Sequence, residues 1–202
     1  KWIESDLITK TINDYNDNME EIEQKLPKPL ILENLIENGD FSDGTSGWSV
    51  LPTWTVEDNT LFIDVTKSTF GQVDKSFAVN VGHKYYSSAE YYSSVNDASL
   101  SALLATFSGT TTSKVKSMNT WERLSIHFSV VSGNEMILRV LQTTFREQEV
   151  DIRIKNINFI DLTATFGAGN EPTKEEMDEI INIIGWFDNE YAVSNKEMFI
   201  AL

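Results

Sequence analysis

The sequence predicts a mainly β protein: a jelly-roll β-sandwich with an N-terminal coiled-coil-like helix and a C-terminal amphipathic helix. After Trp121, apolar and polar residues alternate, as in a strand that buries one face. Turn-forming pairs, among them Asn38-Gly39 and Ser132-Gly133, separate several stretches of this kind. Helical periodicity is strongest near the two ends of the chain.

The composition fits a packed domain and limits its chemistry. The chain has 202 residues, of which 41% are hydrophobic and 11% aromatic, enough for a β-core. It has no cysteine, which excludes disulfides, thiolate nucleophiles and Cys-type zinc sites. The net charge of −15 would repel nucleic acid, and equally a polyanionic teichoic acid unless a cation bridges the two. No apolar run is long enough for a membrane span.

Residues 1–29 predict an oligomerisation helix followed by a proline linker. Apolar residues recur there with the 3.5-residue period of a coiled-coil seam: Ile8, Ile12, Tyr15, Met19, Ile22 and Leu26. A helix this short needs a partner. Further copies of the chain would form a parallel homo-oligomer, with a trimer expected from the isoleucines in the seam; alternatively, the helix packs on its own β-domain. Pro27 and Pro29 end the helix and stiffen the exit.

Residues 30–165 contain the predicted sandwich. The strand that starts at Trp121 is expected to bury Leu124, Ile126, Phe128 and Val130. The last strand alternates through Ile152 and Ile154 and then changes phase, which predicts a β-bulge near Lys155-Asn156.

Paired tyrosines within this domain predict a face for sugar stacking. Period two places Tyr86, Glu90 and Tyr92 on one face of their strand, and Tyr85, Ala89 and Tyr91 on the core face. Two aromatic rings flanking a carboxylate suit stacking on sugar rings and hydrogen bonding to their hydroxyls. Trp54, between two threonines, is a further candidate. The alternative for all three aromatics is packing in the core or against another protein.

Residues 166–202 predict a docking helix and a tail. A Gly-rich turn from Phe166 to Gly169 leads to Thr173 and Glu176, which have capping-box spacing. An apolar stripe then ends at Gly185; it consists of Met177, Ile180, Ile181 and Ile184. Such a stripe docks either on the chain's own β-domain or on a neighbouring subunit.

Two stretches resemble a known family. NLIENGDFSDGTSGW (Asn34–Trp48) and INFIDLTATFGAGNEPTKEE (Ile157–Glu176) resemble tail and baseplate proteins of bacteriophages of Gram-positive bacteria. Those proteins often carry a jelly-roll module similar to carbohydrate-binding modules. The resemblance implies that Phe41 and Trp48 are core anchors and that Trp121 takes a core-edge position.

The same resemblance implies a role in the virion. The chain would be a structural protein of the tail tip or baseplate, an oligomeric adaptor or the subunit that binds a host cell-wall saccharide, with other tail proteins as partners. The alternative is a non-catalytic carbohydrate-binding module of a secreted or surface bacterial protein. We expect no enzymatic activity, because no nucleophile–base grouping and no placed pair of carboxylates stands out in the sequence.

A structural calcium ion is a further implication of the resemblance. It would lie between the first loop and the final strand, bound by Asp40, Asp43 and Asp161. Ser42 stands where the family carries an acidic residue. The alternative is that these aspartates cap turns and a strand end.

Overall fold

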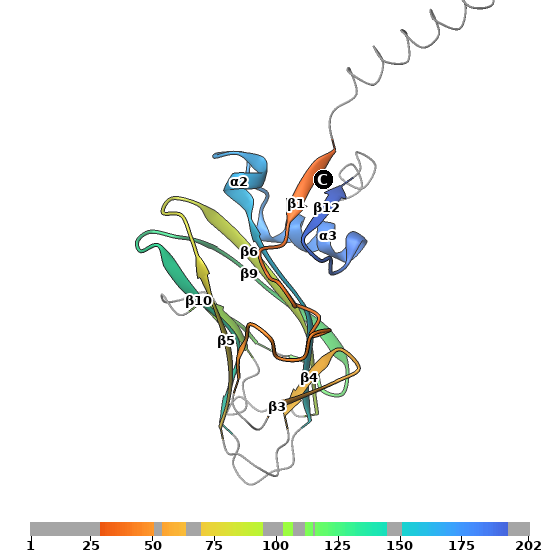
Figure 1. Cartoon of the computed structure of the whole chain (residues 1–202). Helices are drawn as coiled ribbons and strands as arrows, with labels where there is room; N and C mark the ends of the chain where they lie inside the picture. Colours follow the sequence, from red (N-terminus) through yellow and green to blue (C-terminus); the bar gives the residue numbers. More distant parts are fainter. Residues whose placement is uncertain are drawn as a thin grey trace, which may run out of the picture.

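The computed structural model describes residues 29–50, 54–63, 70–94, 103–106, 112–114, 116–144 and 151–193. Within this part, two five-stranded antiparallel sheets form a β-sandwich (Figure 1). The predicted jelly-roll sandwich is thus present, whereas the seam from Ile8 to Leu26 lies outside the described residues. None of the described helices is long and apolar enough to cross a membrane.

Each sheet is named here after one of its strands. The β5 sheet contains, in spatial order, β2 (Ser49–Val50), β5 (Phe70–Ala78), β10 (Glu135–Thr144), β7 (Leu103–Thr106) and β8 (Thr112–Lys114). The β6 sheet contains β3 (Trp54–Glu57), β4 (Thr60–Ile63), β11 (Ile152–Asp161), β6 (Lys84–Ser93) and β9 (Trp121–Ser129). The core lies between the two sheets.

The core contains the residues that the alternation assigned to it. Leu124, Ile126, Phe128 and Val130 are buried, as are Tyr85, Ala89 and Tyr91. Phe159 of β11 joins them through stacked rings, with its centroid 4.5 Å from that of Phe77 and 5.4 Å from that of Tyr85. These sequence predictions are confirmed.

A third layer covers part of the outer face of the β6 sheet. It consists of β1 (Leu30–Glu33), β12 (Glu190–Val193), α2 (Leu162–Phe166) and α3 (Lys174–Ile184), and is called the cap below. β1 pairs with β12, so the two ends of the described chain lie side by side (Figure 1). The apolar cluster between the cap and the β6 sheet contains Leu32, Tyr86, Ile160, Leu162, Met177, Ile180, Ile181, Phe187 and Val193. The C-terminal segment therefore docks on its own β-domain.

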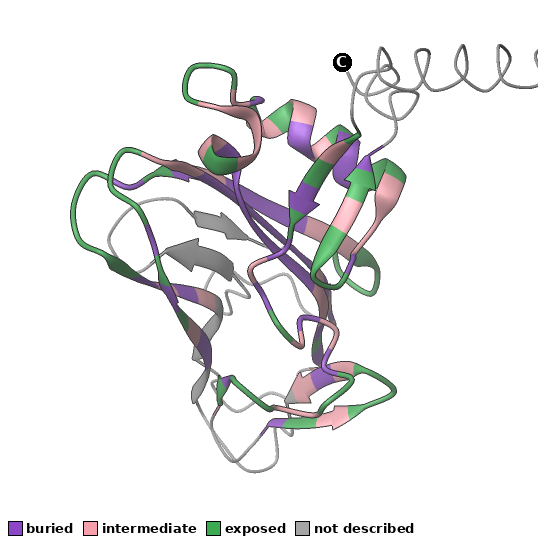
Figure 2. Ribbon diagram, turned by 45° about the horizontal axis from the view of Figure 1, so that its top comes forward, coloured by how far each residue is buried: buried purple, intermediate pink, exposed green. Residues whose placement is uncertain are grey.

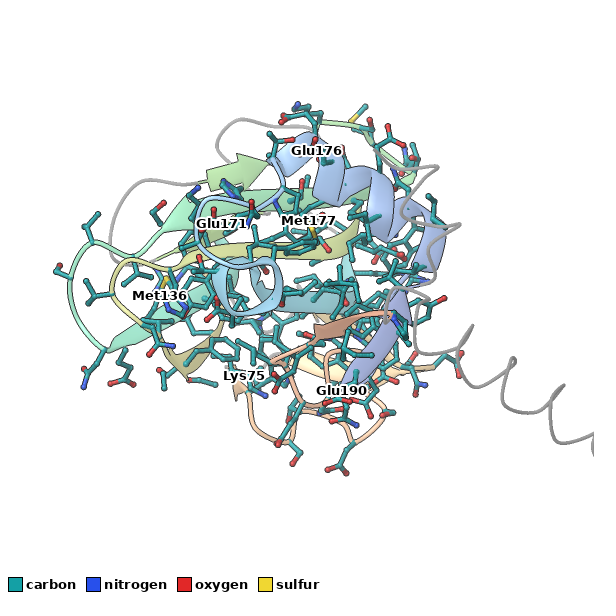
Figure 3. The ribbon with its side chains drawn as sticks, turned by 90° about the horizontal axis from the view of Figure 1, so that it is seen from above. Lys75, Met136, Glu171, Glu176, Met177 and Glu190 are labelled. Atoms are coloured by element: carbon teal, nitrogen blue, oxygen red, sulfur yellow. The ribbon has the colours of Figure 1, made fainter. Side chains whose placement is uncertain are left out.

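The predicted capping box opens α3. The Thr173 hydroxyl accepts a hydrogen bond from the backbone N–H of Glu176, and the Glu176 carboxylate accepts one from the N–H of Thr173. Figure 3 looks down on this region, with Glu176 and Met177 on α3 and Glu171 in the loop before it. Met177 is fully buried, and the burial colouring of Figure 2 shows α3 with one buried side.

The run from Asn38 to Phe41 forms part of the loop before β2. The Asn38 side chain donates to the carbonyls of Gly44 and Ser46, and Trp48 Nε1 donates to the carbonyl of Asn38. Phe41 and Trp48 are buried with ring centroids 5.4 Å apart, which confirms them as core anchors. The motif is therefore structural.

A β-bulge interrupts β11 at the predicted place. The pairing with β6 shifts between Lys155 and Asn158, and Asn156 has a φ of 56°. Ile154 before the bulge and Ile157 after it both point into the core, although they are three residues apart. The outer face consequently receives Lys155 on one side of the bulge and Ile160 on the other.

Candidate functional site

The cap divides the outer face of the β6 sheet into a covered half and an open half. In the covered half Ile160 and Tyr86 pair across β11 and β6 beneath the cap. In the open half, pairing aligns four residues in one row across β4, β11, β6 and β9: Phe62, Arg153, Tyr92 and Trp121. Because neighbouring strands lie about 4.8 Å apart, this aromatic row spans about 14 Å.

Trp121 and Tyr92 lie next to each other at the β9 end of the aromatic row. Their ring centroids are 6.0 Å apart with an interplanar angle of 50°, and Trp121 is 40% exposed. The Lys155 ammonium lies 4.4 Å from the Trp121 ring centroid, and the Arg153 guanidinium lies 5.5 Å from that of Tyr92. These cation–π contacts fix the rings while leaving much of the indole in solvent.

Charged side chains stand in the next row toward the cap. The Glu90 carboxylate accepts a hydrogen bond of 3.4 Å from Arg123 and lies 3.8 Å from the Lys155 ammonium. Arg123 also donates to Asn182 of α3 at 2.8 Å, which ties the open half to the cap. The open half thus offers both hydrogen-bond donors and a carboxylate beside the exposed ring of Trp121 and the half-buried ring of Tyr92.

A hollow of about 170 Å³ lies at the β4 end of the aromatic row. It is lined by Glu57, Asp58, Thr60, Phe62 and Arg153. Arg153 donates to both carboxylate oxygens of Asp151 at 2.8–3.2 Å, and these hydrogen bonds raise the pKa of its guanidinium.

The prediction that Tyr86 and Tyr92 form an open aromatic surface is wrong for Tyr86. The ring of Tyr86 is fully buried under the cap, and its hydroxyl donates to Asp178 of α3 at 2.7 Å. Burial, reinforced by the Asp178 charge, raises the pKa of this phenol. Trp54 is only 5% exposed and belongs to the sandwich core, so the prediction that it stacks on a sugar is also wrong.

Tyr92 and Glu90 do lie together on the open half, beside Trp121 and Arg153, which the sequence patterns did not indicate as binding residues. Trp121 is not at the core edge: alternation counted back from Leu124 places it outward, which the sequence could have shown. The alternation of Arg153 with Ile152 and Ile154 likewise marks it as outward, but nothing in the sequence placed it beside Tyr92.

The aspartates proposed for calcium do not come together. Asp40 accepts hydrogen bonds from the backbone N–H and hydroxyl of Ser42. Asp161 accepts from the N–H of Ala164 at the start of α2, and its Oδ2 lies 2.8 Å from Nδ1 of His83. In the described part of the chain, no group of three or more acidic or histidine side chains could hold a metal ion. The set of Asp40, Asp43 and Asp161 therefore does not fit calcium.

Comparison with known proteins identifies the fold. No protein-family model and no curated protein sequence matches the chain. The structure of the module TmCBM61 in complex with β-1,4-galactotriose matches with a TM-score of 0.52 and 14% identity, over 63% of this chain and 98% of that chain. The sandwich is therefore similar to that of a carbohydrate-binding module, and at this identity the similarity shows the fold alone.

Two further solved structures align less closely. A structure described as "CBM4 structure and function" has a TM-score of 0.49 and 11% identity, over 62% of this chain and 99% of that chain. The enzymatically active domain of tailspike protein 4 of bacteriophage CBA120 has a TM-score of 0.43 and 13% identity, over 62% of this chain and 21% of that chain. Neither similarity is close enough to support an argument about function.

Proposed function

We propose that this chain is a non-catalytic glycan-binding module whose binding surface is the open half of the outer face of the β6 sheet. The observation that carries the proposal is the exposed Trp121, set in register with Tyr92 between fixed cations. An aromatic pair on a rigid sheet, with one ring exposed, the other half-buried and polar groups converging beside them, is a surface suited to a sugar chain.

The chemistry of the surface supports this role. Aromatic rings offer flat apolar area to the C–H face of a sugar. Glu90 can accept hydrogen bonds from hydroxyls, and Arg123 and Lys155 can donate to ring and hydroxyl oxygens. Few polar contacts and one stacking surface supply little surplus free energy, so we expect a dissociation constant on the order of 1 mM.

The test is a titration of the full chain with bacterial cell-wall fragments and with defined oligosaccharides, in which NMR of the protein measures binding. Trp121→Ala should weaken binding about five- to tenfold, the cost of losing one stacking contact of roughly 1–1.5 kcal/mol. Val131→Ala, at an 86% exposed position in the β9–β10 loop, is the control and should bind as the wild type does. Equal binding by Trp121→Ala would show that the ligand surface lies elsewhere, and release of reducing sugar would show an enzyme.

The biological setting belongs to the same proposal. The chain would serve in the tail tip or baseplate of a phage virion, as an oligomeric adaptor or the subunit that binds the host cell-wall glycan. Its support is the sequence resemblance of Asn34–Trp48 and Ile157–Glu176, together with the seam from Ile8 to Leu26. Several weak sites on one oligomer would raise the effective affinity through avidity. A carbohydrate-binding module of a secreted or surface bacterial protein would need no such seam.

A further inference from the structure

The hollow at the β4 end of the aromatic row has the parts of a single-sugar subsite. Phe62 supplies an aromatic wall in line with Tyr92 and Trp121. Thr60 supplies a hydroxyl, and Glu57 and Asp58 supply carboxylates. The hollow thus combines an apolar wall with hydrogen-bonding groups at the end of a surface on which a sugar chain would lie.

A tight turn holds the acidic wall in place. β3 and β4 are joined through Asp58 and Asn59, both in the left-handed region with φ of 47° and 55°. Two successive residues of this kind are typical of a type I′ hairpin, whose geometry matches the twist of the strands. Asp58 is therefore presented by a short, well-defined connection.

The charge around the hollow is unbalanced. Its cation, Arg153, is engaged by both oxygens of Asp151. Glu57 is close enough for its charge to act on Arg153, but neither Glu57 nor Asp58 forms an ion pair with any other described residue. Two carboxylates thus remain beside the cavity, and both can only accept hydrogen bonds. An acidic sugar or a phosphate would be repelled there, whereas an ammonium group would gain charge-assisted hydrogen bonds.

We propose that this hollow binds a hexosamine unit with a free, protonated amine, with Phe62 against the sugar ring and Glu57 and Asp58 on the ammonium. The inference rests on the proposed function, because the rest of the sugar chain would lie along Tyr92 and Trp121. It adds the ligand class: a glycan carrying unacetylated amino sugars, in preference to neutral or acidic ones.

The experiment compares two probes with the same backbone, the β-1,4-linked trisaccharides of glucosamine and of N-acetylglucosamine. Binding is followed by NMR on the full chain at mildly acidic pH and low salt. The glucosamine probe should bind about three- to tenfold more tightly, the range expected for one or two exposed charge pairs. This preference should shrink toward equality in about 1 M salt, where charges are screened beyond about 3 Å.

Two double variants separate the hollow from the bulk charge of the protein. Glu57→Gln/Asp58→Asn should abolish the preference for the amine while leaving binding of the N-acetyl probe within about twofold. Glu135→Gln/Asp188→Asn removes the same charge at two exposed positions outside the hollow and should keep the preference. Trp121→Ala should weaken the binding of both probes.

The outcomes distinguish the inference from the proposed function. Equal binding of the two probes by the wild type, or a preference that persists in Glu57→Gln/Asp58→Asn, overturns the inference. If both probes still depend on Trp121, the proposed function stands. A chain that binds neither probe also overturns the inference, and the cell-wall titration then decides the proposed function.

Discussion

Buried polar side chains connect separate segments of this molecule through hydrogen bonds, and Asn34 is the clearest case. Its side-chain amide donates to the carbonyls of Ile157 and Phe187, and its side-chain oxygen accepts from the N–H groups of Ile36 and Phe159. Asn34 is 5% exposed, so water cannot readily replace these partners. One residue thereby joins the segment directly after β1, strand β11 and the segment after α3.

Asn34→Ala should lower the free energy of unfolding by about 3 kcal/mol or more, because several buried backbone groups lose their partner together. Urea denaturation followed by circular dichroism measures this. Asn134→Ala, at an exposed loop position, is the control and should stay within about 0.5 kcal/mol of the wild type. A similarly small effect at Asn34 would mean that the network is replaceable by water.

At the scale of elements, the loop between α2 and α3 is organised around Glu171. Its carboxylate accepts from the Thr163 hydroxyl at 2.8 Å, the Gly169 N–H at 2.9 Å and the Lys84 ammonium at 3.1 Å. Gly169 has a φ of 87°, which a glycine adopts without strain. The Gly-rich run thus folds back on one carboxylate and links the loop to β6.

Because of these contacts, the stability of the cap should decrease as the pH falls into the acid range. A hydrogen bond from its own backbone N–H, then those from Thr163 and Lys84, lower the pKa of Glu171 from 4.5 to about 2. A carboxyl whose folded pKa is lowered stabilises the fold fully above its unfolded pKa, and this contribution is lost as pH falls from about 4.5 toward 2.

Glu171→Gln should therefore be less stable than the wild type at neutral pH, and the difference should narrow between pH 4.5 and about 2. Thermal unfolding measured across that range tests this. Glu135→Gln, at an exposed position on the other sheet, should show no such pH-dependent gap. A gap of constant size in Glu171→Gln would show that the carboxylate charge is not the cause.

At the scale of the whole molecule, the cap ties the two ends of the described chain together. β1 follows directly after the proline linker and pairs with β12 along four residues, from Leu30 opposite Val193 to Glu33 opposite Glu190. A cut before Leu30 leaves this pairing and the Asn34 network intact. The β-domain with its cap should therefore fold without the segment that precedes it.

Deleting Lys1–Leu26 should convert a parallel homo-oligomer, expected to be a trimer, into a folded monomer, because the deletion removes the whole predicted seam. Sedimentation equilibrium gives the mass, and circular dichroism confirms the fold. A truncated chain that keeps the mass of the full chain would disprove the coiled-coil hypothesis. Full-length protein that is already monomeric would favour packing of the helix on its own β-domain.

Features that depend on local periodicity could be predicted from the order of the amino acids alone. The buried face of β9, the core side of β6, the bulge at Lys155-Asn156 and the capping box of α3 were all predicted. Each follows from a repeat of two or four residues or from a capping pair, and such patterns involve neighbours along the chain. The phase of β6 correctly separated Tyr85 from Tyr86.

Long-range packing, in contrast, sets which outward residues are accessible and which lie together. Tyr86 and Tyr92 share one face of β6, yet the cap buries Tyr86 and leaves Tyr92 open, because α3 folds back over half of the sheet. Residues of four strands meet in the aromatic row through cross-strand register, which depends on long-range pairing. For the same reason, the spacing of Asp40 and Asp161 in the sequence could not show that they serve separate turns.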